Sequence, residues 1–451
     1  MSDSETRMDR LRRALAEGLL VGDGSTGSAL SALAGGDYER LALFPLERPE
    51  LVRALHEAYL EAGSEIVETA TFTASSRGLE KFVPTCQSPE ALAYRLNLEA
   101  ARIAREAAGR AEAASGRPRW VAGSIGPGDA PPSLGASSYA ELKASYLPQA
   151  RGLADGGADF AILETCQDPL QIKAAIAALG SGEGGRGLPF IVSATVDSRG
   201  LLLAGTDVDA LIAIVAPFAP LAVGLNCSGG PEELEAPLAR LAAVSPFPLS
   251  FMPNAGLPRE EGGQTVWPLG PEDFAARVEA LARRYGVALA GGCCGTFPAH
   301  IERLSARLAD RPRPSERPRP LPALSSLYGA KPIGEGLFRI GERANAAGSA
   351  SFAAAIEADD FDGAAALAVK QEAAGAAALD LHVSRPGRDE GADLSALASR
   401  LSGLARAALC LDSNDPDVLA RALSAVGGRP ILNSTSLEDP ARARRVFALA
   451  K

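Results

Sequence analysis

The chain has 451 residues, of which 47% are hydrophobic and 22% are charged, so it has enough apolar material for a folded core and is not intrinsically disordered. A formal net charge of −10 over this length argues against nucleic acid or an anionic membrane as the main partner. Six cysteines are too few for a disulfide scaffold, and three histidines disfavour chemistry based on clustered imidazoles, so any bound metal would rely mainly on thiolates.

Eight short apolar runs, each followed by a helical pattern, occupy the first two thirds of the chain. The predicted strands are 18–22, 65–70, 119–124, 159–164, 189–195, 221–226, 248–252 and 287–292. Several of the helices between them begin with Pro or Ser followed by acidic residues, as helices often do. Runs of parallel βα units close naturally at eight. We therefore predict an α/β fold with a complete (β/α)8 TIM barrel over residues 1–310.

Neither an export signal nor a membrane span is predicted. The N-terminal segment MSDSETRMDRLRR is charged throughout and has no apolar core. Residues 210–231 carry no charge, but they contain Pro217, Pro220 and Asn226, so we interpret them as a helix, a turn and a buried strand. The expected location is the cytoplasm, with reduced cysteines.

A stiff linker and a second α/β unit follow the barrel. Residues 311–322 contain five prolines and four arginines, which is typical of an extended linker, and we place the linker at 311–333. Further strands are predicted at 337–341, 377–382, 407–411 and 430–433, with helices near 363–374, 394–405, 416–425 and at the C-terminus. Four βα units leave an open sheet edge. We expect residues 334–451 to be the first half of a second TIM barrel, which either pairs with something else or belongs to a fragment of a longer protein.

Polar residues fall where the predicted barrel strands end, which is where barrel enzymes carry their chemistry. Asp23-Gly24 follow the first strand, Glu68 and Thr71 the second, and Glu164 the fourth. The three carboxylates could hold the ammonium group of an amino-acid substrate. Alternatively, they could form salt bridges or helix caps around the barrel mouth.

Three of the six cysteines fall at the same rim. Cys227 follows the sixth strand, and Cys293 and Cys294 follow the eighth. Three thiolates suit zinc and leave the fourth tetrahedral position open, as in a catalytic site. A substrate thiol at that position would lose its proton, which suits S-alkylation without a histidine base. A vicinal disulfide or plain packing remains an alternative from spacing alone.

The remaining cysteines and the histidine near the rim show no such grouping. We interpret Cys86, Cys166 and Cys410 as buried structural thiols. His300 lies at the predicted start of the last barrel helix, so we assign it a structural role rather than that of a fourth metal ligand.

Six segments of the predicted barrel resemble the homocysteine S-methyltransferase family. They are DGSTGSAL (23–30), RPELVRALHEAYLEAGSEIVETATF (48–72), VAGSIGP (121–127), ADFAILETCQD (158–168), GLNCSGGP (224–231) and GGCCGTFPAHI (291–301). The resemblance implies that Cys227, Cys293 and Cys294 bind zinc, which coordinates the homocysteine thiolate. It also implies that Asp23 and Glu164 bind the substrate amino group, with Gly24 and Thr71 beside them.

The second unit resembles the start of the pterin-binding domain of cobalamin-dependent methionine synthases. The segment FRIGERANAAGSASF (338–352) carries this resemblance, supported by the later strands. It implies that Glu342, Asn345 and Asp380 face a pterin. Two positions depart from the family pattern. His382 stands where asparagine is usual, and Asn414 falls one position early, so that Asp415 occupies the usual asparagine position.

Together, the two resemblances imply zinc-dependent methyl transfer to the thiolate of homocysteine, giving methionine. Methylcobalamin would be the immediate donor, carried on a domain or protein outside this chain, and 5-methyltetrahydrofolate the ultimate donor. One alternative is a cobalamin-independent homocysteine S-methyltransferase that uses S-methylmethionine or betaine. Another is a non-catalytic module that binds homocysteine or a corrinoid.

Overall fold

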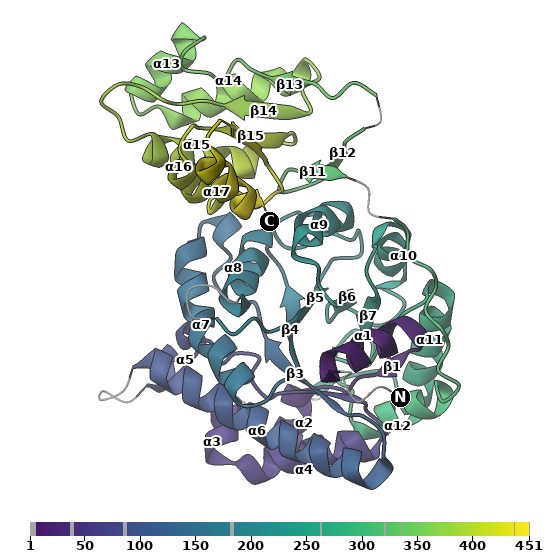
Figure 1. Cartoon of the computed structure of the whole chain (residues 1–451). Coiled ribbons are helices and arrows are strands. Elements are labelled where there is room, and N and C mark those ends of the chain that lie inside the picture. Colours follow the sequence, from purple (N-terminus) through teal and green to yellow (C-terminus); the bar gives the residue numbers. More distant parts are fainter. Residues whose placement is uncertain are drawn as a thin grey trace.

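The computed structural model describes two α/β units, a large barrel and a smaller open sheet, which follow one another in the chain (Figure 1). The described residues are 6–36, 40–83, 88–180, 185–261, 264–319, 322–334, 336–436 and 438–450. Cys86 lies outside them. No described helix has both the length and the apolar character needed to cross a bilayer.

Eight parallel strands of the first unit form one sheet in the order β1-β10-β7-β6-β5-β4-β3-β2. They are β1 (Leu20–Val21), β2 (Ile66–Glu68), β3 (Trp120–Ile125), β4 (Phe160–Cys166), β5 (Phe190–Ala194), β6 (Val223–Asn226), β7 (Leu249–Met252) and β10 (Leu289–Ala290). The outer strands meet through a backbone hydrogen bond of 2.7 Å from the Glu65 N–H to the Val21 carbonyl. The sheet therefore rolls into a nearly closed barrel, which confirms the predicted α/β barrel and its eight strands.

Helices surround this barrel because the strands are buried on both faces and need a cover outside. The longer ones are α2 (Thr26–Leu33), α4 (Pro49–Glu61), α6 (Pro89–Ser115), α7 (Tyr139–Asp155), α8 (Pro169–Leu179), α9 (Val208–Val215), α10 (Glu235–Val244), α11 (Pro271–Tyr285) and α12 (Pro298–Arg307). Short turns are α3 (Phe44–Glu47), α5 (Ser76–Leu79), η1 (Leu41–Leu43), η2 (Glu80–Phe82), η3 (Pro132–Leu134) and η4 (Ala216–Phe218). Side chains of Ser88, Ser138 and Asp168 accept hydrogen bonds from the first turns of α6, α7 and α8, as good helix caps do.

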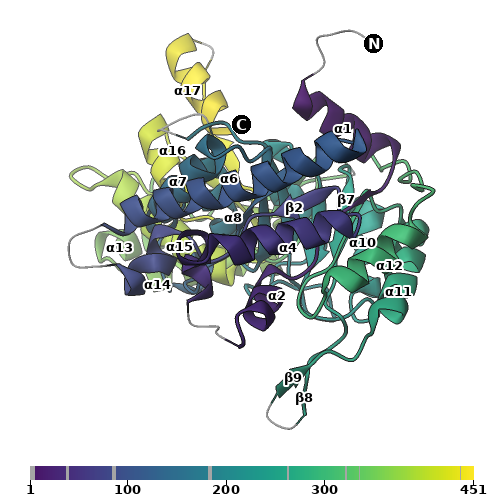
Figure 2. The same cartoon turned by 90° about the horizontal axis from the view of Figure 1, so that it is seen from below.

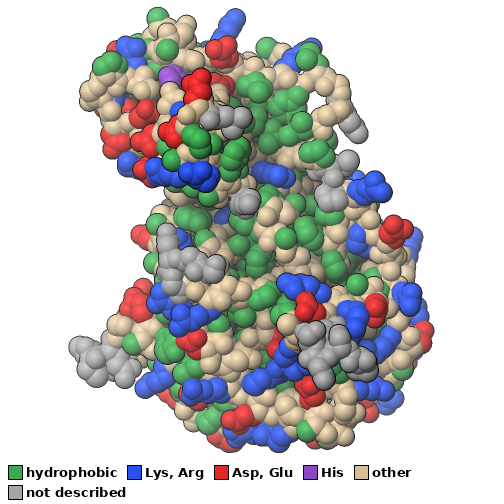
Figure 3. Space-filling view, viewed as in Figure 1, with side chains coloured by type: hydrophobic (Ala, Val, Ile, Leu, Met, Phe, Trp, Pro, Cys, Tyr) green, Lys and Arg blue, Asp and Glu red, His purple; other side chains and the backbone are tan. Residues whose placement is uncertain are grey.

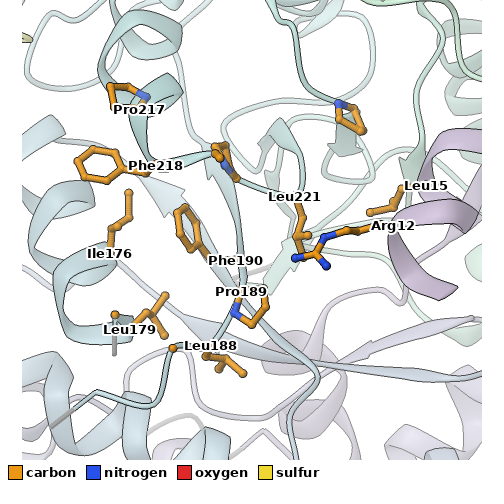
Figure 4. Close-up of a pocket in the computed structure, with 15 residues that line it drawn as sticks. Arg12, Leu15, Ile176, Leu179, Leu188, Pro189, Phe190, Pro217, Phe218 and Leu221 are labelled. Atoms are coloured by element: carbon orange, nitrogen blue, oxygen red, sulfur yellow. The ribbon is translucent and has the colours of Figure 1, made fainter. Parts of the chain in front are cut away.

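The amino-terminal end of the barrel is covered by α1 (Arg7–Glu17), whose Leu11 and Leu15 pack with Trp120 and Phe160. Beside α1, a cavity of about 600 Å³ opens at the starts of β5, β6 and β7 (Figure 4). Its lining is largely apolar, and Arg12 is the one charged side chain among the described residues around it.

Two hairpins were not predicted. The hairpin of β8 (Arg259–Glu261) and β9 (Gln264–Val266) projects from the barrel after β7 (Figure 2). The hairpin of β11 (Ala323–Ser325) and β12 (Ala330–Pro332) lies inside the predicted linker. At its turn, the Tyr328 carbonyl accepts a hydrogen bond of 2.9 Å from the Asp207 N–H, and the Tyr328 hydroxyl donates to the Gly403 carbonyl. The second hairpin thus contacts both α/β units.

The second unit is a four-stranded parallel sheet in the order β13-β14-β15-β16. Its strands are β13 (Ile340–Gly341), β14 (Ala378–Leu381), β15 (Ala408–Asp412) and β16 (Ile431–Asn433), and its helices are α13 (Ala350–Glu357), α14 (Phe361–Ala373), α15 (Glu390–Leu404), α16 (Pro416–Leu423) and α17 (Pro440–Ala450). All four predicted strands are present, and α13 was not predicted. Leu379, Leu381, Leu409 and Leu411 are buried in one core with the helices, whereas Ala378 and Ala408 contact Leu324 of β11.

Candidate active site

The three rim cysteines converge at the carboxyl-terminal end of the barrel. Cys227 follows β6, and Cys293 and Cys294 follow β10, which is separated from β6 in the sheet only by β7. Their Sγ atoms all lie within 4.8 Å of one another, and none of the three forms a disulfide. Zinc–sulfur bonds of about 2.3 Å in a tetrahedral site place the sulfurs about 3.8 Å apart. The cluster therefore has the dimensions and the donor set for one zinc ion.

The three sulfurs interact strongly enough to change one another's acidity. Hydrogen bonds from the thiols of Cys293 and Cys294 lower the pKa of Cys227 to about 3. Contact with Cys227 in turn raises the pKa of Cys293 well above its usual value and that of Cys294 to about 12. Three adjacent thiols cannot all ionise at neutral pH unless a cation balances their charges. This is a site suited to a divalent cation.

Strained backbone surrounds Cys227. Thr165, Cys227 and Ser228 have φ angles of 56°, 60° and 55°, in the left-handed region that residues with a side chain rarely adopt. The side chain of Asn226, which directly precedes Cys227, binds Thr165. Its Oδ1 accepts hydrogen bonds from the Thr165 N–H at 2.9 Å and the Ser193 hydroxyl at 2.8 Å, and its Nδ2 donates to Thr165 Oγ1 at 2.9 Å. Asn226 therefore ties together the ends of β4, β5 and β6 and fixes the start of the Cys227 turn.

The turn with the other two cysteines depends on a second asparagine and on a glycine. Asn254 Oδ1 accepts a hydrogen bond of 3.0 Å from the Cys294 N–H. Gly295 has a φ of 75°, and a Cβ atom there would lie 2.1 Å from the ring of Trp267. Any larger residue at position 295 would therefore displace the turn that presents Cys293 and Cys294.

Three carboxylates lie in the same region of the barrel. Asp23 and Glu68 are buried, and Glu164 is half-buried. Asp23 Oδ2 accepts a hydrogen bond of 2.8 Å from the Glu68 N–H, and Glu164 accepts one from the Ser124 hydroxyl. Asp23 Oδ1 has no partner among the described residues. Among the described residues, none of the three side chains caps a helix or forms a salt bridge, so those alternatives do not explain the carboxylates.

Burial and mutual repulsion make these carboxylates weak acids. Burial raises the pKa of Glu164 to about 7. Burial also raises the pKa of Asp23 and Glu68 well above the usual range, and the charge of Glu164 raises both further. No described lysine or arginine contributes to these shifts. Arg77 and Lys81 also line the hollow that holds the site, but among the described residues neither forms an ion pair with these carboxylates. A ligand ammonium group would supply the positive charge that allows the carboxylates to ionise.

One hollow of about 760 Å³ joins the thiols with Glu68 and Glu164, whereas the buried Asp23 is not among the residues that line it. Gly24, Thr71 and Glu164, all predicted site residues, line it together with the three cysteines. The Thr71 hydroxyl donates to the Ser124 carbonyl at 2.7 Å, so it is already engaged in the wall. A Cβ at Gly24 would lie 2.8 Å from Thr296 Oγ1, which explains why glycine stands at that point of the wall.

Cys166 and His300, both predicted to be structural residues, lie outside the thiol cluster. Cys166 is buried, and its thiol donates to the Leu163 carbonyl. His300 Nδ1 accepts a hydrogen bond from the Phe297 N–H, and Nε2 lies 3.1 Å from the Leu269 carbonyl. His300 is thus a structural residue at the start of α12.

Asn226, Asn254 and Ser124 were not predicted as site residues. The signal for Asn226 was a polar side chain at the end of an otherwise apolar strand.

The predicted pterin contacts lie at the carboxyl-terminal rim of the second sheet and differ in their surroundings. Glu342 is exposed. Asn345 Oδ1 accepts hydrogen bonds from the N–H groups of Ala347 and Gly348, so it stabilises a local turn. Asp380 is buried, with its Oδ1 3.4 Å from Nδ2 of Asn433. Asp380 is therefore the predicted contact that the strands hold most firmly.

The fold and the site define a parallel α/β-barrel protein with a three-cysteine, metal-type centre at its carboxyl-terminal rim. The sequence matches the homocysteine S-methyltransferase family over residues 20–308 and the pterin binding enzyme family over residues 341–451. The chain belongs to the homocysteine S-methyltransferase family and thus to a family of methyltransferases.

Relatives and solved structures agree with this assignment. The chain is 37% identical to the methionine synthase of Mycobacterium tuberculosis over 94% of its own length, and 36% identical to that of Mycobacterium leprae over 95%. It spans 36% of the length of each relative. The metallated homocysteine methyltransferase MmuM from Escherichia coli is similar in structure, with a TM-score of 0.53 and 26% identity over 64% of this chain and 96% of MmuM. The apo form of MmuM gives a TM-score of 0.51 at 27% identity and the same coverage.

Proposed function

We propose that this chain transfers a methyl group to the thiolate of homocysteine, giving methionine, with one zinc ion held by Cys227, Cys293 and Cys294. The observation that carries the proposal is a single hollow lined by three convergent thiols and by Glu68 and Glu164, which form no ion pair among the described residues. Homocysteine has the complementary groups, a thiol and an ammonium group. When bound, zinc would supply Lewis acidity that turns the substrate thiol into a thiolate at neutral pH.

The side chains of the chain position this substrate. Asp23 and Glu164 accept hydrogen bonds from its ammonium group, and Glu68 adds negative charge behind them. Thr71 and Gly24 shape the wall beside the substrate backbone. Because an ammonium group favours the ionised carboxylates, its arrival lowers their raised pKa values and releases protons from the site. The positively charged end of homocysteine thereby fixes the thiol toward the cysteines.

We infer that the methyl donor is methylcobalamin, carried by a domain or protein outside this chain, and that 5-methyltetrahydrofolate is the ultimate donor. The pterin-family match at residues 341–451 and the methionine synthase relatives support this proposal. The second sheet would then be the first half of a pterin-binding barrel, with Glu342, Asn345 and Asp380 toward the pterin. We assign residues 1–310 to the homocysteine barrel, 311–333 to the linker and 334–451 to the pterin unit. The need for reduced thiols favours the cytoplasm as its compartment.

Methyl transfer from methylcobalamin to homocysteine tests this function directly. The full chain loaded with zinc is expected to form methionine and to hold one zinc ion. Cys227→Ala should lose both properties, whereas Cys166→Ala, which removes a buried cysteine outside the cluster, should keep them. Full zinc content and full transfer in Cys227→Ala would overturn the assignment. Methionine formed from S-methylmethionine or betaine, but not from methylcobalamin, would replace the proposed donor by the cobalamin-independent alternative.

A further inference from the structure

The two ends of the barrel differ in the side chains that they carry. On the side that α1 covers, hydrophobic side chains gather near α8 and α9 (Figure 3). At the carboxyl-terminal ends of the strands, buried polar side chains meet instead, among them Asp23, Tyr59 and Thr296. Buried polar groups are normally hydrogen-bonded, so the partners of Tyr59 and Thr296 indicate what these two residues hold in place.

Tyr59 of α4 ties the loop after β1 to the turn that presents Cys293 and Cys294. Its hydroxyl lies 3.0 Å from the Ser25 carbonyl and 3.1 Å from the Thr296 carbonyl, and its one proton is shared between these two acceptors. The side chain is fully buried. One hydroxyl group therefore joins two segments that are 271 residues apart in the sequence.

Thr296 strengthens the same connection. Its Oγ1 and its carbonyl each accept a hydrogen bond of 3.1 Å from the Ser25 N–H, and its Oγ1 donates to the Cys293 carbonyl at 2.6 Å. Thr296 is as deeply buried as Tyr59. We call Tyr59 and Thr296 the brace. The brace fixes the cysteine turn against the start of α2.

The loop after β1 extends this connection to the carboxylates. The Asp23 carbonyl accepts a hydrogen bond of 2.9 Å from the Gly292 N–H, next to the cysteine turn. The Asp23 carboxylate accepts one of 2.8 Å from the N–H of Glu68, which lines the hollow. Residues 23–25 therefore link the thiol end of the hollow to its carboxylate end.

Two glycines show how closely the brace is packed. A Cβ at Gly24 would lie 2.8 Å from Thr296 Oγ1 and 2.9 Å from the Tyr59 hydroxyl, and a Cβ at Gly292 would overlap the Thr296 side chain. The loop after β1 and the cysteine turn thus meet the brace through bare backbone. They cannot approach each other more closely without displacing it.

The Tyr59 hydroxyl keeps its proton in this setting. Burial raises its pKa well above the usual value, and the charges of Asp23, Cys293 and Glu68 raise the pKa further. The hydroxyl is therefore a hydrogen-bond donor at neutral pH. The same charges show that Tyr59 lies within electrostatic reach of both the thiols and the carboxylates.

We propose that Tyr59 and Thr296 are positioning residues that fix the distance between the thiol-binding and ammonium-binding ends of the site, and thereby set the length of the amino-acid thiol that fits. The inference rests on the proposed function for the class of substrate. Homocysteine has one methylene group more than cysteine between its α-carbon and its sulfur. When both ends of a site are fixed, only one of these lengths can reach both, and one methylene group is worth about 10- to 200-fold in discrimination.

Calorimetric titration of the full, zinc-loaded chain with homocysteine and with cysteine tests the proposal. The unaltered chain is expected to bind homocysteine about 10- to 200-fold more tightly than cysteine. Tyr59→Phe, which removes only the hydroxyl, should lower this ratio by about 3- to 10-fold, as for loss of one hydrogen bond. Thr296→Val should also lower the ratio, and it serves if Tyr59→Phe does not fold. Thr296→Ser keeps the hydroxyl and should keep the ratio.

Tyr146→Phe is the matched control. Tyr146 of α7 is also buried, and its hydroxyl lies 3.2 Å from the Gly126 carbonyl and 2.9 Å from the Pro127 carbonyl, in the loop after β3. Its loss should lower stability and leave the ratio of the two affinities unchanged. Each variant should hold one zinc ion, because the brace contacts the backbone of the cysteine turn. Loss of zinc from Tyr59→Phe would overturn the proposal, since the brace would then support the metal ligands themselves.

The outcomes separate this inference from the proposed function. A purely structural role would weaken the binding of both amino acids alike, so an unchanged ratio in Tyr59→Phe and Thr296→Val would overturn the role of the brace and leave the proposed function standing. Equal affinities of the unaltered chain for homocysteine and cysteine would do the same. Absence of homocysteine binding by the unaltered chain would overturn the proposed function and this inference together.

Discussion

Replacement of Asn226 by leucine tests how the barrel rim holds Cys227. The Asn226 side chain makes four hydrogen bonds: it accepts from the Thr165 N–H and the Ser193 hydroxyl, and it donates to Thr165 Oγ1 and, at 3.9 Å, to Cys293 Sγ. It directly precedes a turn in which Cys227 and Ser228 adopt left-handed φ angles, and its partner Thr165 on β4 adopts one as well. Each such residue costs about 1–2 kcal/mol, so the strained turn needs external support.

The loss expected in Asn226→Leu follows from these bonds. Each hydrogen bond contributes about 1 kcal/mol, and a buried donor left without a partner costs about 1–3 kcal/mol. We therefore expect the free energy of unfolding to fall by about 3–5 kcal/mol. Relaxation of the turn moves Cys227 away from Cys293 and Cys294, so zinc affinity should also fall, by about 10- to 100-fold, as for other residues that orient metal ligands.

Urea unfolding and zinc competition against a chromophoric chelator measure these two effects. Asn97→Leu is the matched control, because Asn97 is a fully buried amide on α6 that donates to the Ala74 and Ala93 carbonyls. The control should lose stability but keep its zinc affinity. Equal zinc affinities in the two variants would refute the idea that Asn226 positions Cys227.

Three further predictions concern buried charges. His56 is buried without a partner for either ring nitrogen among the described residues, and burial lowers its pKa from 6.5 to about 4. The folded state therefore favours neutral His56, and the free energy of unfolding falls as pH drops from 6.5 toward 4. In urea unfolding, His56→Leu should remove about 3 kcal/mol of this acid-induced loss of stability. A loss of the same size in the variant would contradict the prediction. Because burial raises the pKa of Glu164 to about 7, homocysteine should bind more tightly as pH rises through 7. In calorimetric titration, Glu164→Gln should bind homocysteine about 10- to 100-fold more weakly and without this pH dependence. If the variant keeps the pH dependence, Glu164 is not its cause. Lys173 of α8 donates hydrogen bonds to the Val426 and Gly428 carbonyls of the second unit. In scanning calorimetry, Lys173→Met should therefore lower the stability of that unit by about 1–3 kcal/mol. An unaltered unfolding transition would show that the contact is dispensable.

The barrel strands could be predicted from sequence because a strand buried on both faces is a nearly continuous apolar run. The hairpin of β11 and β12 could not, since it directly follows residues 311–322, which are rich in proline and arginine and predict an extended linker. It is stabilised by contacts of Tyr328 with Asp207 and Gly403, which are distant in sequence. The short helix α13 also lacks a distinct apolar period, and Ser349 at its start was the only clear signal.

The candidate site was predictable in its thiols and carboxylates but not in the groups that position them. Cys227, Cys293 and Cys294 stand out because each follows a predicted strand. The role of Asn226 depends on which strands are neighbours, since its partners lie on β4 and β5. The hydrogen bonds of Tyr59 to Ser25 and Thr296 likewise require the register of β1 against β10. The local sequence pattern indicates neither the order of the strands in a sheet nor their register.

The most direct test of the account is the sulfur coordination of the zinc ion, measured by X-ray absorption at the zinc edge. We predict three sulfur ligands at about 2.3 Å from Cys227, Cys293 and Cys294, and a fourth sulfur when homocysteine is added. Replacing homocysteine by methionine, which has no thiol, should leave three. A zinc ion whose sulfur number does not rise with homocysteine would contradict the claim that this centre activates the substrate thiol.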